Sequence, residues 1–431
     1  MLIVVISLVI GLFIDSSSVK IQRFITTGFS EYNLSIFSVL FIVLALGQLI
    51  VFLILRRKED QYIPPVKSLY AAFIAVILIQ IALQTLILLS ILDMVFYAQY
   101  HLMYIVISVV TSYVFSSTMI FYLCYRFIKW TITNFNYYTL AYGIASFAIG
   151  MNIILTLMYV LDITTSQPDI VRFHLGHISG VGRYILLQDA YFVSSIIAYV
   201  GTWGATAVLM YHYKSRVGKI KYYFTTLLPL VFFMSQFNPY LSQLLVDYRS
   251  ANPTFFGISY VIFFSASIPL GAVIFGFGLR LQASSLSGGK QSVKNYLALA
   301  SYGILLLFSS NQAVVLVNFS YPPFGLMTVS MLGLSSFLLT LGIYSSAISV
   351  ANDREILKAV RNSVSKESSL LDKMGTATMR DDLERRILDI TNSLSHHLTE
   401  QSGLDPSLSE SDVQKYLKEA IEETRKRKPM T

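Results

Sequence analysis

Residues 33–58 decide the fold class, and they read NLSIFSVLFIVLALGQLIVFLILRRK. No charged residue occurs from 33 to 55, and Arg56, Arg57 and Lys58 follow immediately. An α-helix rises about 1.5 Å per residue, so this segment is long enough to cross a hydrocarbon core of about 30 Å. The stretch therefore predicts a membrane-spanning helix with a positively charged end.

The composition of the whole chain agrees with this stretch. Hydrophobic residues make up 55% of the 431 residues, charged residues 13%, and the mean hydropathy is +0.62. A soluble domain carries about 25% charged residues. The sequence predicts an all-α, polytopic transmembrane helix bundle with a small helical cytoplasmic C-terminal region. Nine segments are apolar and long enough to span: 33–55, 68–94, 100–125, 137–161, 190–213, 222–246, 254–279, 295–317 and 324–349.

Basic residues in the connecting loops predict the orientation of the bundle. Alternate loops, after the first, third, fifth and seventh segments, hold 13 Lys or Arg residues, against 5 on the opposite side. Cytoplasmic loops of membrane proteins are enriched in Lys and Arg. We therefore expect a multi-pass protein of the cell membrane, with the chain after Ser349 in the cytoplasm.

The N-terminal segment MLIVVISLVIGLFI, residues 1–14, leaves the number of spans open at nine or ten. It is short for a span, and it lacks the basic start of a typical signal peptide. A short tenth helix is favoured over a cleaved signal. The expected organisation is an N-terminal segment and outer loop (1–32), a helix bundle (33–349) and a cytoplasmic helical tail (350–431).

The tail has a soluble, helical pattern. Ile356, Val360 and Val364 recur every four residues, which predicts that the last membrane helix continues into the cytoplasm. A second helix is indicated by Leu383, Ile387, Ile390 and Leu394 on one face. Such faces favour a cytoplasmic protein partner or a homodimer through residues 350–425. The formal net charge of +8 resides in the membrane loops, so the lipid bilayer is the expected partner and nucleic acid is not.

Uncharged polar groups mark the predicted candidate ligand site. Gln236 and Asn238 lie beside Pro239 in the sixth segment, and Asn311 and Gln312 lie at a similar depth in the eighth. Proline frees a helix carbonyl, which such amides can satisfy. Interhelical hydrogen bonding is the main interpretation. A ligand or substrate cavity lined by these four amides is the alternative.

Two histidines, His174 and His177, are candidate metal ligands in the outer loop 162–189. A spacing of three on a helix allows two imidazoles to share a metal ion. Gly176 argues against a firm helix there, and no third ligand is clustered with them. An ordinary outer loop is the favoured interpretation. We find no paired carboxylates or nucleophile–base set at membrane depth, so we expect neither an enzyme nor a cofactor.

One region resembles a known family. It contains Tyr321-Pro-Pro-Phe-Gly-Leu, Gly333-Leu-Ser-Ser, Gly342-Ile-Tyr-Ser-Ser-Ala-Ile-Ser-Val and, in the tail, Lys366-Glu-Ser-Ser-Leu-Leu-Asp-Lys-Met-Gly-Thr-Ala. Over residues 320–380 the chain is similar to a family of uncharacterised archaeal multi-span membrane proteins. The resemblance implies an archaeal cell membrane, and it implies no catalytic or binding residue.

Three functional hypotheses follow from the sequence. A sensory or signal-relaying membrane protein is favoured, because a last span joined to a cytoplasmic helix can transmit a movement to partners. A permease-like transporter for an uncharged or amphipathic solute would use the four amides. A structural subunit of a larger membrane complex is the third hypothesis.

Overall fold

The computed structural model describes residues 1–22, 30–57, 67–164, 169–172, 178–179, 184–211, 214, 218–235, 237, 253–285, 291–311, 318–319, 321–352 and 369–402. The helices in these ranges are α1 (Leu2–Gln22), α2 (Ser30–Arg57), α4 (Lys67–Tyr97), α5 (Leu102–Thr133), α6 (Tyr137–Thr164), α7 (Ile185–Tyr211), α9 (Lys219–Ser235), α11 (Pro253–Ser285), α12 (Gln291–Ser310), α13 (Leu326–Ser330), α14 (Leu332–Asn352) and α16 (Ser369–Ser402). The strands are β1 (Gln99–His101), β2 (Ile170–Arg172), β3 (Ile178–Ser179) and β4 (Asn318–Phe319).

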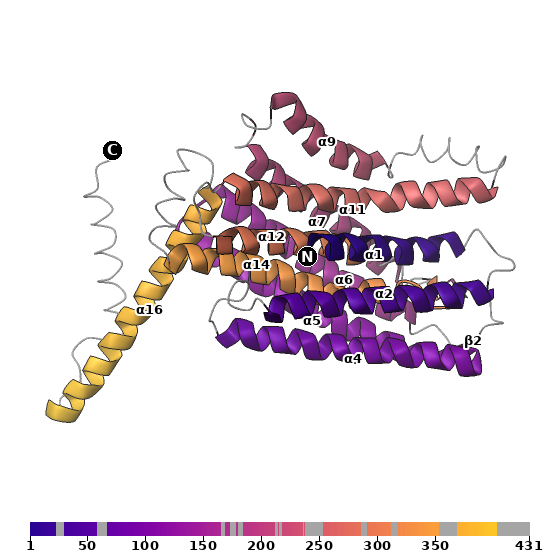
Figure 1. Cartoon of the computed structure of the whole chain (residues 1–431). Coiled ribbons are helices and arrows are strands. Elements are labelled where there is room, and N and C mark those ends of the chain that lie inside the picture. The colour runs from indigo at the N-terminus through magenta and orange to yellow at the C-terminus, as the bar shows by residue number, and fades with distance from the viewer. Residues whose placement is uncertain are drawn as a thin grey trace.

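Long helices lie side by side in a bundle, and α16 leaves one end of it obliquely (Figure 1). Within the described ranges, 8 segments are long and apolar enough to cross a membrane. The predicted all-α membrane-type bundle is therefore confirmed at that level. The predicted segments 222–246 and 295–317 are not among the 8. In the structure α9 ends at Ser235 and α12 at Ser310, and most of the residues that would complete these spans lie outside the described ranges.

The N-terminal segment forms a full-length helix, α1, packed along α2. The contacts are reciprocal: a Cβ built on Gly11 would lie 2.8 Å from Leu44 Cδ2, and one built on Gly47 would lie 2.5 Å from Leu8 Cδ2. Each glycine therefore receives a leucine of the other helix, so the two antiparallel helices approach closely. Residues Leu2–Val19 are one of the 8 candidate spans, and the tenth-helix interpretation of this segment stays a prediction.

Helix α14 lies in the centre of the bundle. Every residue from Pro322 to Ile348 is buried, whereas the best membrane window of each other candidate span is 28% to 56% buried. Glycines permit this enclosure. A Cβ on Gly303 of α12 would lie 2.3 Å from the Leu339 backbone nitrogen, and one on Gly342 would lie 2.4 Å from the Ala300 nitrogen. The α12 and α14 backbones are therefore in direct contact, as small residues allow in membranes.

Two short antiparallel ribbons lie at one end of the bundle. Gln99 in β1 pairs with Arg172 in β2, and Ile178 in β3 pairs with Phe319 in β4. The β2 ribbon is at the end opposite α16 in Figure 1. Tyr321 also donates a hydrogen bond from its hydroxyl to the Met94 carbonyl, at 3.0 Å. These contacts join the ends of α4, α12 and the 162–189 connection.

The first turns of α16 pack against the end of the bundle. Leu370, Leu371, Met374 and Ala377, in the first turns of α16, are buried. A Cβ on Gly375 would lie 2.3 Å from Val350 Cγ1, so α16 packs directly on the end of α14. The predicted continuation of the last span through Ile356, Val360 and Val364 lies outside the described residues.

Candidate functional site

The predicted last span consists of α13 followed by α14, and Met331 between them keeps a right-handed helical conformation. Neighbouring helices donate hydrogen bonds to carbonyls just before Met331. The Gln80 side chain of α4 donates through Nε2 to the Ser330 carbonyl at 2.9 Å. Ser112 of α5 donates through Oγ to the Val329 carbonyl at 2.6 Å. Both donors are buried, so side chains of α4 and α5 are bonded directly to the end of α13.

Asp15 of α1 holds the other end of α13. Its carboxylate accepts hydrogen bonds from the Gly325 and Thr328 backbone nitrogens, both at 2.9 Å, and from Thr328 Oγ1 at 2.7 Å. Gly325 has φ +93°, a left-handed conformation that favours glycine. Asp15 is fully buried. A buried carboxylate is costly unless hydrogen bonds compensate for lost water, and here three donors do so.

A second group of polar side chains joins α6, α7 and the end of α12. Asn311 donates through Nδ2 to Asn152 Oδ1 at 2.8 Å. Asn152 in turn donates through its Nδ2 to Ser194 Oγ at 3.0 Å and to Ser195 Oγ at 2.9 Å. Both serine hydroxyls donate to the Tyr191 carbonyl. The result is a continuous chain of uncharged hydrogen bonds through the bundle.

The two groups lie at a similar depth. Ser112 of α5 donates to the Val329 carbonyl of α13, and Ser310 of α12 lies 3.4 Å from Ser335 of α14. The polar residues of α5 and α12 therefore lie within about two helical turns of Met331. We call these side chains the polar layer. Its members are Gln80, Ser112, Asn152, Ser194, Ser195, Ser310, Asn311 and Ser335.

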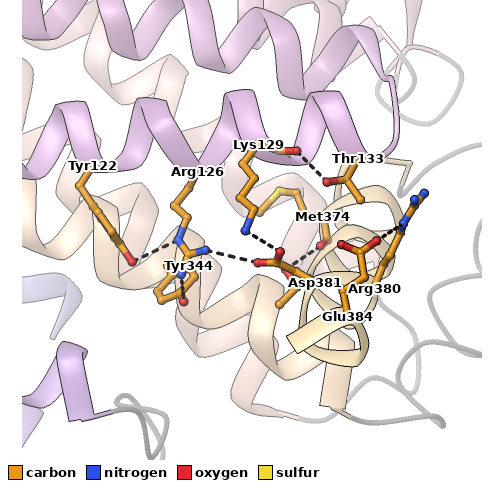
Figure 2. A network of polar contacts seen from close by, with 10 residues as sticks. Tyr122, Arg126, Lys129, Thr133, Tyr344, Met374, Arg380, Asp381 and Glu384 are labelled. Carbon is orange, nitrogen blue, oxygen red and sulfur yellow. Dashed lines mark hydrogen bonds and ion pairs between the residues drawn. The ribbon is translucent and has the colours of Figure 1, made fainter. Parts of the chain in front are cut away.

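A charged cluster occupies the other end of α14 (Figure 2). Asp381 of α16 lies 2.5 Å from Lys129 Nζ and 3.9 Å from Arg126 Nη1, both of α5. Arg126 also donates to the Tyr344 hydroxyl of α14 and, at 3.1 Å through Nε, to the Tyr122 hydroxyl. The Arg126 side chain is 13% exposed and that of Asp381 19%. We call these five residues the clamp, because they connect α5, α14 and α16.

Lys214, between α7 and α9, is a further basic residue with aromatic partners. Its Nζ donates to the Tyr223 hydroxyl at 2.7 Å and lies 4.4 Å from the centroid of that ring. The Tyr211 and Tyr222 rings are 5.3 Å and 5.7 Å away. The hydrogen bond to Tyr223 raises the pKa of Lys214 above its ordinary value, so the ammonium stays charged. Tyrosine and lysine together are typical of a membrane–water interface.

Of the six predicted site residues, the structure describes one. Asn311 is in the polar layer, where its partner is Asn152 of α6. Gln236, Asn238 and Gln312 lie outside the described residues, and so do His174 and His177. Within the described residues there is no group of three metal-ligating side chains. The predicted four-amide cavity and the predicted histidine pair therefore stay predictions.

Sequence reasoning missed Asp15, Asn152 and the clamp. The signal for Asp15 was present, because it directly follows the apolar run 1–14, and α1 extends past it to Gln22. Asn152 is one isolated amide in an apolar segment, and its partners come from 42 to 159 positions away. The clamp joins residues 218 to 255 positions apart, which no local pattern reveals.

Comparison with known proteins finds no match: no family model, no curated protein and no solved structure is similar to this chain. The resemblance over 320–380 stays a prediction.

Proposed function

We propose that the chain is a signal-relaying membrane protein in which α14 couples the polar layer to the cytoplasmic helix α16. The observation that carries the proposal is the position of α14. The chain is enclosed from Pro322 to Ile348. Asp15, Gln80 and Ser112 bond α13, which runs directly into α14, and Val350 near the end of α14 packs on Gly375. A movement of α14 along or about its axis must therefore change contacts at both ends.

The clamp supplies the contact at the α16 end. Asp381 meets Arg126 and Lys129 across a partly exposed site, and Arg126 also contacts Tyr344 of α14. Partly exposed ion pairs contribute about 1 kcal/mol each, so they can break and re-form on small changes in geometry. Such a contact suits a switch better than a fully apolar one. A cytoplasmic partner or a second copy would bind the distal part of α16, where Leu383 is 49% exposed.

The proposed topology is multi-pass with the C-terminus in the cytoplasm, and ten spans including α1 and the segments 222–246 and 295–317. The support is that α2 ends in Arg56 and Arg57, and that Arg126 and Lys129 lie beside α16. Basic residues from separate loops thus gather at one end of the bundle, which is the pattern of cytoplasmic ends.

The test perturbs one end of α14 and observes the other. Asp15→Asn weakens the hold on α13, and hydrogen exchange of residues 369–390 reports on α16. We expect faster exchange in α16 in Asp15→Asn, and loss of that effect when two glycines are inserted after Ala351 of α14. The control is Ser18→Ala, because Ser18 is half-buried and its hydroxyl donates to the Ile14 carbonyl of its own helix. Unchanged α16 exchange in a folded Asp15→Asn protein would falsify the relay.

A permease for an uncharged or amphipathic solute is the second candidate. The observation that favours it is the uncharged hydrogen-bond chain from Asn311 through Asn152 to α7. Stopped-flow light scattering of proteoliposomes under a glycerol gradient separates the two functions. Glycerol entry that is lost when Asn152 is replaced would favour the permease. Absence of glycerol entry, together with faster α16 exchange in Asp15→Asn, would favour the relay.

A further inference from the structure

The charges of the clamp are divided between two helices. Its cations, Arg126 and Lys129, are both on α5, whereas Asp381 is on α16 (Figure 2). The neighbouring acidic residues Asp382 and Glu384 are on α16 as well, and Glu384 pairs within its own helix. Among the described residues, the counter-charge of the α5 cations therefore comes from α16. When α16 moves away, the two cations keep only uncharged partners in the described region.

Asp381 satisfies the Arg126 guanidinium only in part. Nε of Arg126 donates to the Tyr122 hydroxyl and Nη2 to the Tyr344 hydroxyl, and both acceptors are uncharged. Nη1 lies 3.9 Å from Asp381 Oδ2, beyond hydrogen-bond distance, whereas Oδ1 of the same carboxylate lies 2.5 Å from Lys129 Nζ. One carboxylate thus contacts both cations and is close enough to hydrogen-bond only one of them.

The spacing and charge of the two cations fit a phosphate group. Because both contact the one carboxylate, a single anion at the same place reaches both. A phosphomonoester has three acceptor oxygens and about two negative charges at neutral pH. It can therefore bond the ammonium of Lys129 while it pairs with the fork of N–H donors on Arg126. An uncharged ligand would leave both cations without a counter-charge, which is costly in a partly buried site.

The cations lie beside residues that face lipid. Tyr125 and Ile128, which directly precede them on α5, are 58% and 45% exposed, and the Lys129 side chain is 29% exposed. All four residues are near the end of the candidate span Leu102–Thr133. Tyrosine and lysine at the end of a span are typical of the headgroup level, where lipid phosphates lie. A lipid is therefore a nearer source of phosphate than the surrounding water.

We propose that the clamp binds the phosphomonoester headgroup of a membrane lipid, which takes the place of Asp381 between Arg126 and Lys129. The Arg126 side chain is 13% exposed, so its charge needs a partner whenever Asp381 leaves. The lipid phosphate supplies that partner and so releases α16. The inference rests on the proposed relay for this effect on α16, of which it names a regulator, and not for the binding itself.

Binding is measured by native mass spectrometry of the full chain, titrated with phosphatidic acid in a neutral detergent. We expect Asp381→Asn to tighten binding of the first lipid about fivefold, because the competing carboxylate is lost. Lys129→Gln should weaken it by a similar factor, because the phosphate loses one cation. The two variants break the same ion pair, so a purely structural role would change lipid binding in one direction only. Phosphatidylglycerol, a phosphodiester with a single negative charge, should bind more weakly than phosphatidic acid.

Release of α16 is measured by hydrogen exchange of residues 370–378 in phosphatidylcholine nanodiscs at constant salt. Phosphatidic acid is added to the lipid, or inorganic phosphate to the buffer, or neither. We expect phosphatidic acid to quicken exchange in the wild type and not in Lys129→Gln, and inorganic phosphate to have no effect.

Two controls remove the same charges outside the clamp. Glu384→Gln, on α16, should keep the lipid affinity within about twofold of the wild type. Lys214→Gln, beside the tyrosines between α7 and α9, should keep the response of α16 exchange to phosphatidic acid.

Equal affinity of the wild type and Asp381→Asn for phosphatidic acid overturns the proposal. So does equal affinity for phosphatidylglycerol, which means a general attraction to anionic lipid, or an equal effect of inorganic phosphate, which means a soluble ligand. Tighter lipid binding by Asp381→Asn, together with unchanged α16 exchange in Asp15→Asn, supports the lipid site and contradicts the relay alone. The two proposals therefore fail separately.

Discussion

At the residue scale, Asp15 shows how one side chain can anchor a helix. Its carboxylate replaces water for the Gly325 and Thr328 nitrogens and for the Thr328 hydroxyl, all of which are buried. Hydrogen bonds to a charged acceptor are about twice as strong as neutral ones. Their removal leaves the two backbone nitrogens without an acceptor, at a cost of about 1–3 kcal/mol for each buried group. The Thr328 hydroxyl keeps the Leu12 carbonyl, at 3.5 Å, as an acceptor.

Asp15→Ala is therefore expected to lower the free energy of unfolding by about 2–6 kcal/mol. Denaturant unfolding in mixed micelles measures the change. Ser18→Ala, one turn along the same helix, should stay within about 0.5 kcal/mol of the wild type. Equal stabilities for the two variants would show that Asp15 does not hold α13.

At the element scale, the close approach of α12 and α14 depends on glycine. Gly303 faces the Leu339 backbone, which cannot move aside as a flexible side chain does. Gly204 of α7 is also in a helix, and a Cβ built there meets nothing within 4 Å. The two positions differ in packing and share the same backbone conformation, so they separate the cost of crowding from helix propensity.

Gly303→Ala should lower the melting temperature, with an overpacking cost of about 1–3 kcal/mol. Gly204→Ala should raise stability by about 0.5–1 kcal/mol, since alanine favours a helix interior more than glycine does. Thermal unfolding in the same detergent measures both. A stabilised Gly303→Ala would contradict the contact between the α12 and α14 backbones.

The clamp is likewise a contact between elements, and salt should weaken it. Asp381→Asn removes the negative charge shared by Arg126 and Lys129, so exchange in residues 370–378 should quicken by an amount equivalent to about 1–2 kcal/mol. Wild-type exchange should approach that of the variant at about 1 M salt, where screening acts over about 3 Å.

Glu384→Gln is the matched control for the clamp. Its partner, Arg380, lies four residues away on the same helix at 3.0 Å, and both side chains are about one-third exposed. Such a pair contributes about 0.3–0.5 kcal/mol. Equal exchange in the two variants would mean that Asp381 does not fasten α16 to the bundle.

At the scale of the whole molecule, orientation is open to a direct measurement. Tyr97, at the end of α4, is 70% exposed, and Phe135, between α5 and α6, is 61% exposed at the opposite end of the bundle. In a Cys124→Ala background, a membrane-impermeant thiol reagent should label Tyr97→Cys in intact cells and Phe135→Cys only after lysis. The reverse pattern would place α16 outside.

The membrane-spanning helices could be predicted from the sequence, because they depend on local composition. The contacts between helices could not, because they join residues that are far apart in the sequence. Segments such as 33–55 and 137–161 are recognisable because each satisfies its own backbone and needs only apolar side chains in lipid. The enclosure of α14 is a property of its neighbours, and nothing in residues 332–352 distinguishes it from a lipid-facing helix except small residues such as Gly342 and Ser346. Asn311 was identified by its polarity, but its partner Asn152 depends on the packing of α6.

The enclosure of α14 also constrains how the protein is made. Helices leave the ribosome in chain order, so α1 to α12 emerge before residues 321–352 do. Until then Asp15, Gln80 and Ser112 lack their α13 partners, and the helices around α14 lack their central neighbour. The central helix of the bundle is therefore the last of the described spans to be inserted. A ribosome stalled before residue 321 should leave a nascent chain that quality-control proteases distinguish from the finished protein.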